Sequence, residues 1–304
     1  MVKKLPGKRG YIHWTAVLVA AAWALFAQIT GNAASQPAEH FQGDRKFQQI
    51  IAEAKAGKWA ALPIGELMGK IAVQLQGIPY RSGTLELSSD REICSVNLEA
   101  LDCVTFFETT LDMARMLKEG GSTPADLLRQ VSHSRYRGGV VGDYSTRLHY
   151  MSGWLIDNQS RGIVKVLSNL PGSEPFKPTV DFLSTHPQAS IQLKAHPELI
   201  EKIKRAEQDV GKMTLSLVPI ARLGAVEPLL KTGDIVAIVS NQDGLDISHT
   251  GLVIRTADGV AHFMDASSRK AVMRVTLEPG SIGDTLKRFT HSPGVIFARP
   301  LEPQ

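Results

Sequence analysis

The chain has 304 residues, of which 43% are hydrophobic and 21% charged, a composition typical of a globular protein with a sizeable core. It excludes collagen, a coiled coil and long disorder. Residues 1–33 hold four Lys or Arg and no Asp or Glu, so they account for the whole net charge of +4 and leave 30 charges of each sign in the remainder. This balance gives no support for nucleic-acid binding, and no nucleic-acid partner is expected.

The first predicted element is a secretory signal peptide over residues 1–33. Its basic residues precede an uncharged run of 16 residues from Trp14 to Ile29, and small residues follow up to Ala33 and Ala34. This order is typical of a signal peptide, with cleavage expected after Ala33 or Ala34. The alternative is an uncleaved membrane anchor, but the run is shorter than the roughly 20 residues that a span needs. We therefore expect a periplasmic or secreted protein, which contacts a membrane only if the leader is uncleaved.

Helical patterns follow the leader. The polar, alanine-rich stretch 35–60 is predicted to be helical, and apolar residues recur at helical spacing over 63–75. Gly77 and Pro79 end that pattern. A further helix is predicted to begin at Cys103 with Asp102 as its N-cap, and its apolar positions continue to Leu117.

The second half of the chain turns to strand patterns. Residues from about 119 to 230 are mixed and are interpreted as a long insertion. Short β-rich runs follow at 233–240, 249–256, 260–268 and 294–300, separated by turn residues. Helices followed by antiparallel strands predict an α+β fold.

The only two cysteines, Cys94 and Cys103, allow two interpretations. In an exported protein they could form a disulfide that closes a small loop. A cysteine at a helix N-terminus can instead be a nucleophile, because the unpaired N–H groups and the helix dipole favour an anion there. We predict that Cys103 is free in the active protein.

A nucleophilic cysteine needs a base, and two of the nine histidines lie on the predicted strands. His249 begins one strand directly after a loop, where a side chain is both rigid and accessible, as a general base must be. His262 lies inside the next strand and is equally consistent with a core histidine. The other histidines lie in loops, polar stretches or the leader. They are scattered and zinc-hydrolase motifs are absent, so no metal and no cofactor are predicted.

Four ordered blocks carry a resemblance to a known family: GIPYRSG (77–83), NLEALDCVTFFE (97–108), RLHYMSGWLIDNQSRGIV (147–164) and GLDISHTGLVIR (244–255). Over roughly 65–300 the chain resembles the NlpC/P60 superfamily of papain-like cell-wall hydrolases. It is most similar to the DUF1460 branch, which is called N-acetylmuramoyl-L-alanine amidase-like.

The resemblance implies roles for particular residues. Cys103 would be the nucleophile, His249 the base and then the acid, and Asp265 the residue that orients His249. Tyr80 would contribute its hydroxyl to the oxyanion region. The family usually has histidine where this chain has Asp265, but a carboxylate can also orient an imidazole and stabilise its protonated form.

The turn between the two histidine-bearing strands decides between Asp265 and His262. A three-residue loop at 257–259 sets Asp265 across from Gly251, on the face of His249. A two-residue turn at 258–259 would put His262 on that face instead. The position of Asp265 within the family pattern favours the first arrangement.

The block that contains Arg147 has two interpretations. Tyr150, Trp154 and Asn158 fall at i, i+4 and i+8, and spacing alone favours a half-buried helix with its aromatic side chains in the core. The resemblance suggests a substrate-binding wall instead, with aromatic rings against a sugar or peptide and Arg147 near a carboxylate.

Together, these features predict an α+β, papain-like NlpC/P60 fold. A helical layer with the nucleophile at a helix N-terminus would pack on an antiparallel, partly barrel-like sheet. We expect a signal peptide at 1–33, an N-terminal helical extension at 34–62 and a catalytic domain at 63–304, with the insertion at about 119–230.

The predicted function is cleavage of an amide bond in peptidoglycan or a muropeptide, with N-acetylmuramoyl-L-alanine amidase as the first choice. The alternatives are a stem-peptide endopeptidase of the NlpC/P60 type and a non-catalytic cell-wall-binding module.

Overall fold

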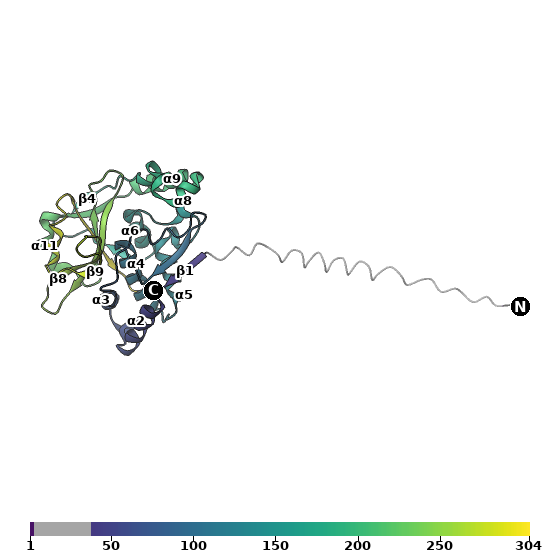
Figure 1. Ribbon diagram of the computed structural model, residues 1–304, viewed down its shortest axis with the longest axis horizontal. Coiled ribbons are helices and arrows are strands. Elements are labelled where there is room, and N and C mark those ends of the chain that lie inside the picture. Colours follow the sequence, from purple (N-terminus) through teal and green to yellow (C-terminus); the bar gives the residue numbers. More distant parts are fainter. Residues whose placement is uncertain (3–37) are drawn as a thin grey trace. The chain divides into compact units, whose positions relative to one another are not determined.

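The computed structural model describes residues 1–2 and 38–304, and residues 38–304 form one compact unit (Figure 1). The predicted signal peptide, its cleavage site and the alternative membrane anchor lie outside the described residues. None of the helices in the described part of the chain is long and apolar enough to cross a membrane.

The compact unit begins with a strand, β1 (Ala38–Gln42), where the sequence predicted only helix. β1 pairs in parallel with β2 (Ile93–Asn97), and helix α2 (Asp44–Ala56) follows β1. The expectation of continuous helix over 35–60 is therefore wrong at its start. The pairing partner of β1 lies more than 50 residues away in the chain, so a local pattern could not reveal it.

A layer of helices follows. It contains α3 (Ile64–Gln74), α4 (Cys103–Lys118), α5 (Pro124–Arg135) and α6 (Met151–Ser160). The predicted helix over 63–75 and the predicted helix start at Cys103 are both confirmed. Three further helices follow between α6 and the last strands: the short helices α7 (Phe182–Thr185) and α8 (Ile191–Ala195), and the longer α9 (Ile200–Gly211).

An eight-stranded sheet forms the other layer. Its order is β4–β5–β10–β6–β7–β8–β9, with β3 also paired to β10, and every pair in it is antiparallel. The strands are β3 (Val164–Val166), β4 (Glu174–Phe176), β5 (Leu215–Pro219), β6 (Ile235–Val239), β7 (Ile247–Arg255), β8 (Ala261–Ser267), β9 (Arg274–Leu277) and β10 (Gly294–Pro300).

The sheet does not close. In the described chain β4 and β9 end the pairing order and do not pair with each other, so the sheet that was expected to be partly barrel-like is not a closed barrel. The predicted strands at 233–240, 249–256, 260–268 and 294–300 correspond to β6, β7, β8 and β10. The fold is α+β with an antiparallel sheet, as the order of patterns predicted.

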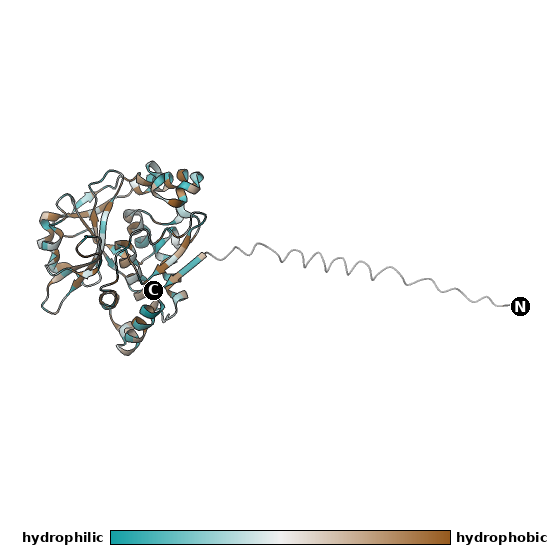
Figure 2. Cartoon of the chain, in the orientation of Figure 1, coloured by the Kyte–Doolittle hydropathy of each residue, from teal (hydrophilic) through white to brown (hydrophobic). Residues whose placement is uncertain are grey.

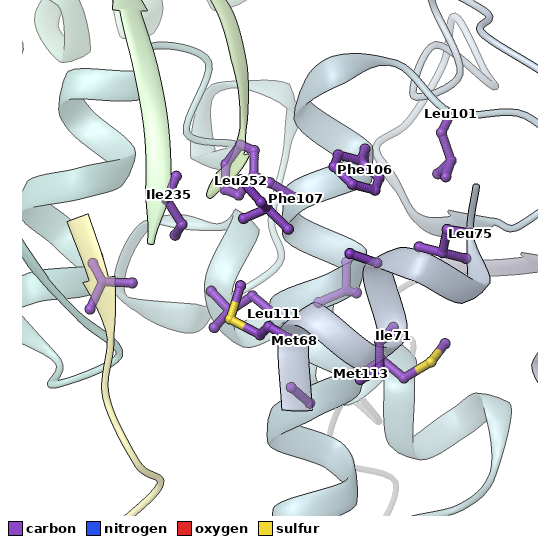
Figure 3. Packing of buried hydrophobic residues seen from close by; sticks show 14 of the residues in the cluster. Met68, Ile71, Leu75, Leu101, Phe106, Phe107, Leu111, Met113, Ile235 and Leu252 are labelled. Atoms are coloured by element: carbon purple, nitrogen blue, oxygen red, sulfur yellow. The ribbon is translucent and has the colours of Figure 1, made fainter. Parts of the chain in front are cut away.

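Apolar side chains fill both faces of the sheet. One cluster joins α3 and α4 to the sheet, and Figure 3 shows Phe107 and Leu111 of α4 beside Met68 of α3 and Leu252 of β7. A second cluster lies on the other face, beneath α10 (Leu223–Val226) and α11 (Ile282–Leu286). Hydrophilic residues dominate outward helices such as α9 (Figure 2). The sheet is therefore held between two apolar layers, which fixes β7 firmly against α4.

Candidate active site

Cys103 is the first residue of α4, and the start of this helix is tightly capped. The Asp102 carboxylate accepts the Thr105 N–H at 2.8 Å, and the Thr105 hydroxyl accepts the Asp102 N–H at 2.9 Å. This reciprocal pair is a capping box, which fixes where the helix begins. Cys103 is only partly buried, and its N–H belongs to the first turn, where helix geometry supplies no partner. A partly exposed thiol beside free N–H donors is suited to anionic chemistry.

The hairpin between β7 and β8 has the three-residue loop 257–259. Thr256 and Val260 close the loop through a backbone hydrogen bond of 3.0 Å, and Gly259 has a positive φ of 82°. Leu252 pairs with Met264, so one further step along this register sets Gly251 across from Asp265. The loop predicted to favour Asp265 is therefore the one observed.

His249 and Asp265 meet through their side chains. The Nε2 atom of His249 lies 2.6 Å from Oδ2 of Asp265, and the side chains are 11% and 1% exposed. His262 lies elsewhere and contacts the carbonyl oxygens of Glu278 and Gly280 and the Thr256 hydroxyl. The geometry brings Asp265 to the predicted place beside His249, and its chemical role stays a prediction.

The electrostatics of His249 favour the imidazolium. Burial lowers its pKa, but the hydrogen bond with Asp265 and the nearby sulfur of Cys103 raise it more, to about 10. Because Nε2 is bonded to Asp265, Nδ1 is the ring nitrogen left for Cys103. The imidazole of His249 is therefore held in its protonated form at neutral pH, with Nδ1 available to the Cys103 sulfur.

Asp265 has unused hydrogen-bonding capacity. Its Oδ1 atom is buried and has no hydrogen-bond partner among the described residues, while Oδ2 is bonded to His249. A buried carboxylate oxygen without a partner is costly, and such groups concentrate where function requires them. The aromatic rings of Phe263 and Phe289 pack beside the His249 imidazole, with centroids 6.1 and 5.9 Å away.

Tyr80 lies next to the start of α4. The bridge between Tyr80 and Leu101 joins the two segments, and the Tyr80 N–H donates to the Met273 carbonyl at 3.0 Å. Burial and the charges of Cys103 and Asp102 raise the pKa of the Tyr80 hydroxyl, so this group stays protonated and able to donate. The structure thus brings Tyr80, Cys103, His249 and Asp265 to one region.

The two cysteines do not form a disulfide. Both are free, and Cys94 is fully buried in β2. Burial raises the pKa of the Cys94 thiol to about 12, which makes this group unreactive at neutral pH. The described residues contain no group of three or more His, Cys, Asp or Glu side chains arranged to hold a metal ion.

The predicted substrate wall lies in the interior. Arg147 is 5% exposed and forms ion pairs with Glu86 and with Glu92, the latter at 3.5 Å. The Tyr150 hydroxyl donates to Glu207 at 2.7 Å. Both side chains therefore have protein partners for the groups that would have contacted a substrate.

The other two residues of that block are equally enclosed. Trp154 is 1% exposed and donates from Nε1 to Glu108 at 3.0 Å, while Asn158 donates to the carbonyl oxygens of Ser134 and Trp154. We therefore assign Arg147, Tyr150, Trp154 and Asn158 to the core and its polar supports. The spacing of the last three already favoured this interpretation.

Two residues near the site were not found by sequence reasoning. Phe289 stacks on His249 from the segment after α11, and Thr250 bonds to the backbone of Cys103. Phe289 gave no signal, because it is a single aromatic residue in a polar stretch. Thr250 lies inside the block 244–255, next to the proposed base. The sequence therefore showed that Thr250 is near the site, but it could not show that Thr250 bonds to Cys103.

The fold and the site define an α+β protein with a thiol, an imidazole and a carboxylate gathered at a helix start. The chain belongs to the AmiA-like family, described as N-acetylmuramoyl-L-alanine amidase-like, which matches residues 70–281. No curated protein matches the chain.

Solved structures support this membership. The chain is similar to an N-acetylmuramoyl-L-alanine amidase from Bacteroides uniformis, with a TM-score of 0.72 and 27% identity over 79% of this chain and 99% of that one. It is also similar to a Bacteroides fragilis protein whose name suggests a xylanase, with a TM-score of 0.65 and 28% identity over 75% of this chain and 98% of that one.

A Legionella pneumophila protein assigned to DUF1460 shares the fold. Its TM-score is 0.64 at 18% identity, over 86% of this chain and 96% of that one. At this identity the likeness concerns the fold.

Proposed function

We propose that this protein is a cysteine-dependent peptidoglycan hydrolase that cleaves the amide bond between the lactyl group of N-acetylmuramic acid and L-alanine. The family and the name of the Bacteroides uniformis neighbour support a peptidoglycan amidase. The observation that carries the cysteine mechanism is the contact between His249 and Asp265 at 2.6 Å, with Cys103 close enough to raise the pKa of His249.

In the first step, the Cys103 thiolate attacks the carbonyl carbon of the amide. The negative charge that develops on the carbonyl oxygen is stabilised by the Cys103 N–H and the Tyr80 hydroxyl. His249 donates the proton on Nδ1 to the leaving amine as the carbon–nitrogen bond breaks. The products of this step are a thioester on Cys103 and a free stem peptide.

In the second step, water hydrolyses the thioester. His249 is now neutral and accepts a proton from the water as the oxygen attacks the acyl carbon. The carbon–sulfur bond breaks and the thiolate of Cys103 is restored. Asp265 holds the imidazole through Nε2 in both steps and stabilises its protonated form.

We also propose a superfamily and a cellular location for the protein. The motifs around Tyr80, Cys103 and His249 support membership of the papain-like NlpC/P60 superfamily, with Asp265 replacing its usual histidine. The basic, apolar and small-residue order of residues 1–33 supports export to the periplasm or beyond, where peptidoglycan is found. The substrate is peptidoglycan or a muropeptide, and no nucleic acid or cofactor is involved.

Glycoside cleavage, which the name of the Bacteroides fragilis neighbour suggests, fits this site less well. Glycosidases typically use two carboxyl groups on either side of the glycosidic bond. Here the Asp265 carboxylate is 1% exposed and bonded to His249, so it faces an imidazole instead of a sugar. A thiol and an imidazole are the parts of an acyl-transfer site.

The test is mass spectrometry of purified muropeptides after incubation with the protein, with Cys103→Ala and with Cys94→Ala. Cys94→Ala is the matched control, because it removes the other thiol. We expect free stem peptide and free sugar from wild type and Cys94→Ala. We expect at least about 1,000-fold less product from Cys103→Ala, which removes the nucleophile.

Each other outcome has a defined meaning. Shortened stem peptides from the wild type would keep the nucleophile but move the cleaved bond into the peptide, as in the endopeptidase alternative. Binding without cleavage by any variant would indicate a wall-binding module. Full activity in Cys103→Ala would overturn the cysteine mechanism.

A further inference from the structure

A single side chain links the helix of the proposed nucleophile to the strand of the proposed base. The hydroxyl of Thr250 donates to the carbonyl oxygen of Cys103 at 2.8 Å, across 147 residues of sequence. Thr250 is 2% exposed, so water does not compete for this bond. One partner is Cys103 itself, and the other is the residue next to His249.

This bond is not needed to build either element. In an α-helix the Cys103 carbonyl accepts the N–H four residues later, and a carbonyl oxygen has a second lone pair. Thr250 uses that second position. Its own backbone belongs to β7, where Thr250 pairs with Ala237 of β6. Removing the hydroxyl would therefore leave both the helix and the strand with their own hydrogen bonds.

The other contacts between α4 and β7 do not fix their relative position so closely. Phe107 and Leu252 belong to one apolar cluster, and apolar contact is non-directional. The capping box of Asp102 and Thr105 is internal to the helix end, and the bond between His249 and Asp265 joins β7 to β8. Apart from the contact between the Cys103 sulfur and His249, whose geometry is to be explained, the bond from Thr250 is the one hydrogen bond of the described residues that joins α4 to β7.

We propose that Thr250 is a positioning residue that sets the separation between the Cys103 sulfur and the His249 imidazole. The proposal rests on the proposed function. Cys103 occupies the first position of α4, so a small shift of the helix against β7 moves its sulfur by the same amount. Catalytic groups tolerate about 0.5 Å of misplacement, and roughly 1 Å can cost on the order of 100-fold in rate.

The experiment compares Thr250→Val, Thr250→Ser and Thr110→Val with the wild type. Valine keeps the shape of threonine without the hydroxyl, and serine keeps the hydroxyl. Thr110→Val is the matched control, because the Thr110 hydroxyl donates to the Phe106 carbonyl at 2.7 Å within α4 and is equally buried. That change removes a similar bond without touching the link to β7.

Three quantities are measured for each variant: kcat and KM on muropeptides, the pH dependence of Cys103 alkylation by iodoacetamide, and the melting temperature. For Thr250→Val we expect kcat to fall about 10- to 100-fold with KM unchanged. We expect the alkylation profile to differ from that of the wild type, because the sulfur moves relative to the His249 imidazole. Thr250→Ser should restore both, and Thr110→Val should leave both unchanged.

The outcomes separate this proposal from the proposed function. A folded Thr250→Val variant with wild-type kcat and alkylation would overturn the positioning role, as would equal losses in Thr110→Val. An effect on KM or on melting temperature alone would also overturn it. If the wild type cleaves no muropeptide, the proposed function fails, while the alkylation profiles still decide the role of Thr250.

Discussion

Two polar clusters begin within two turns of each other on α4 and differ in what surrounds them. The first contains Cys103, His249 and Asp265. Cys103 is partly exposed, and one oxygen of Asp265 has no partner among the described residues. The second is built on Glu108, which is 1% exposed. One oxygen of Glu108 accepts from Arg135 at 2.9 Å and the other accepts from Trp154 at 3.0 Å.

The difference shows how similar residue types acquire different roles. In the Glu108 cluster each carboxylate oxygen has a protein donor, and Nη2 of Arg135, which has no partner among the described residues, is buried out of reach of a substrate. In the Cys103 cluster, three groups are left with unused hydrogen-bonding capacity: Nδ1 of His249, the N–H of the first helical turn and Oδ1 of Asp265. Because unpartnered atoms occur in both clusters, the partial exposure of Cys103 is what distinguishes the first cluster from the buried second one.

The largest effect on stability is expected from Glu108→Ala. The change leaves Arg135 charged, buried and without its partner, which costs about 3–5 kcal/mol of unfolding free energy. Urea denaturation measures this loss. Muropeptide cleavage per folded molecule should stay near wild type. A selective loss of kcat in the folded fraction would show that the Glu108 cluster takes part in catalysis. The contrast between a reactive and a structural cluster would then be wrong.

The next largest effect is expected from Asp265→Asn, which should change how activity depends on pH. The pKa of His249 is about 10, and the reaction uses the imidazolium as its acid, so activity should fall as the pH rises through about 10. Asparagine removes the charge that raises this pKa, while burial still lowers it. The alkaline limb of kcat/KM should therefore move to lower pH, with a loss of about 10-fold or more at neutral pH. An unmoved limb would contradict the role of Asp265.

A smaller effect on stability is expected from Gly251→Ala. A Cβ atom there would lie 2.5 Å from the Met264 carbonyl oxygen and 2.5 Å from the Phe263 ring, so the hairpin beside His249 must shift. We expect a loss of about 1–3 kcal/mol in urea denaturation. Gly224→Ala is the control, because a Cβ there meets no atom within 4 Å. Equal stability of both variants would show that the close approach is not restrictive.

The last prediction needs no mutation and compares the alkylation of the two thiols in the intact protein. At neutral pH, iodoacetamide should modify Cys103 and leave Cys94 unmodified, because burial raises the pKa of Cys94 to about 12 and shields its sulfur. Peptide mass mapping measures both sites in one sample. Comparable labelling of the two cysteines in folded protein would remove the contrast between the clusters.

Local patterns predicted much of this molecule. Asp102 as a cap and the apolar period of α4 each depend on a few neighbouring residues, and each was found as expected. The local residues allowed two turns between β7 and β8, and the family resemblance favoured the loop at 257–259 that is observed. The resemblance then supplied what spacing could not, namely which histidine belongs with Cys103.

Features that depend on distant partners were not predictable. The parallel pair of β1 and β2 joins segments with no shared local signal, and the bond from Thr250 to Cys103 spans 147 residues. Burial of Arg147 depends on Glu86 and Glu92, which reach it from another loop. A charge in a sequence does not show whether its counter-charge comes from the protein or from a substrate.

The central claim is that Cys103 carries the acyl group during amide cleavage. The most direct test is to mix the protein with muropeptide, quench in acid within the first turnover, and determine the intact mass and the modified peptide. The account predicts a thioester on Cys103 whose added mass is that of the sugar-bearing lactyl acyl group, and no adduct in Cys103→Ala. Release of stem peptide with no adduct at any time, together with full activity of Cys103→Ala, would contradict it.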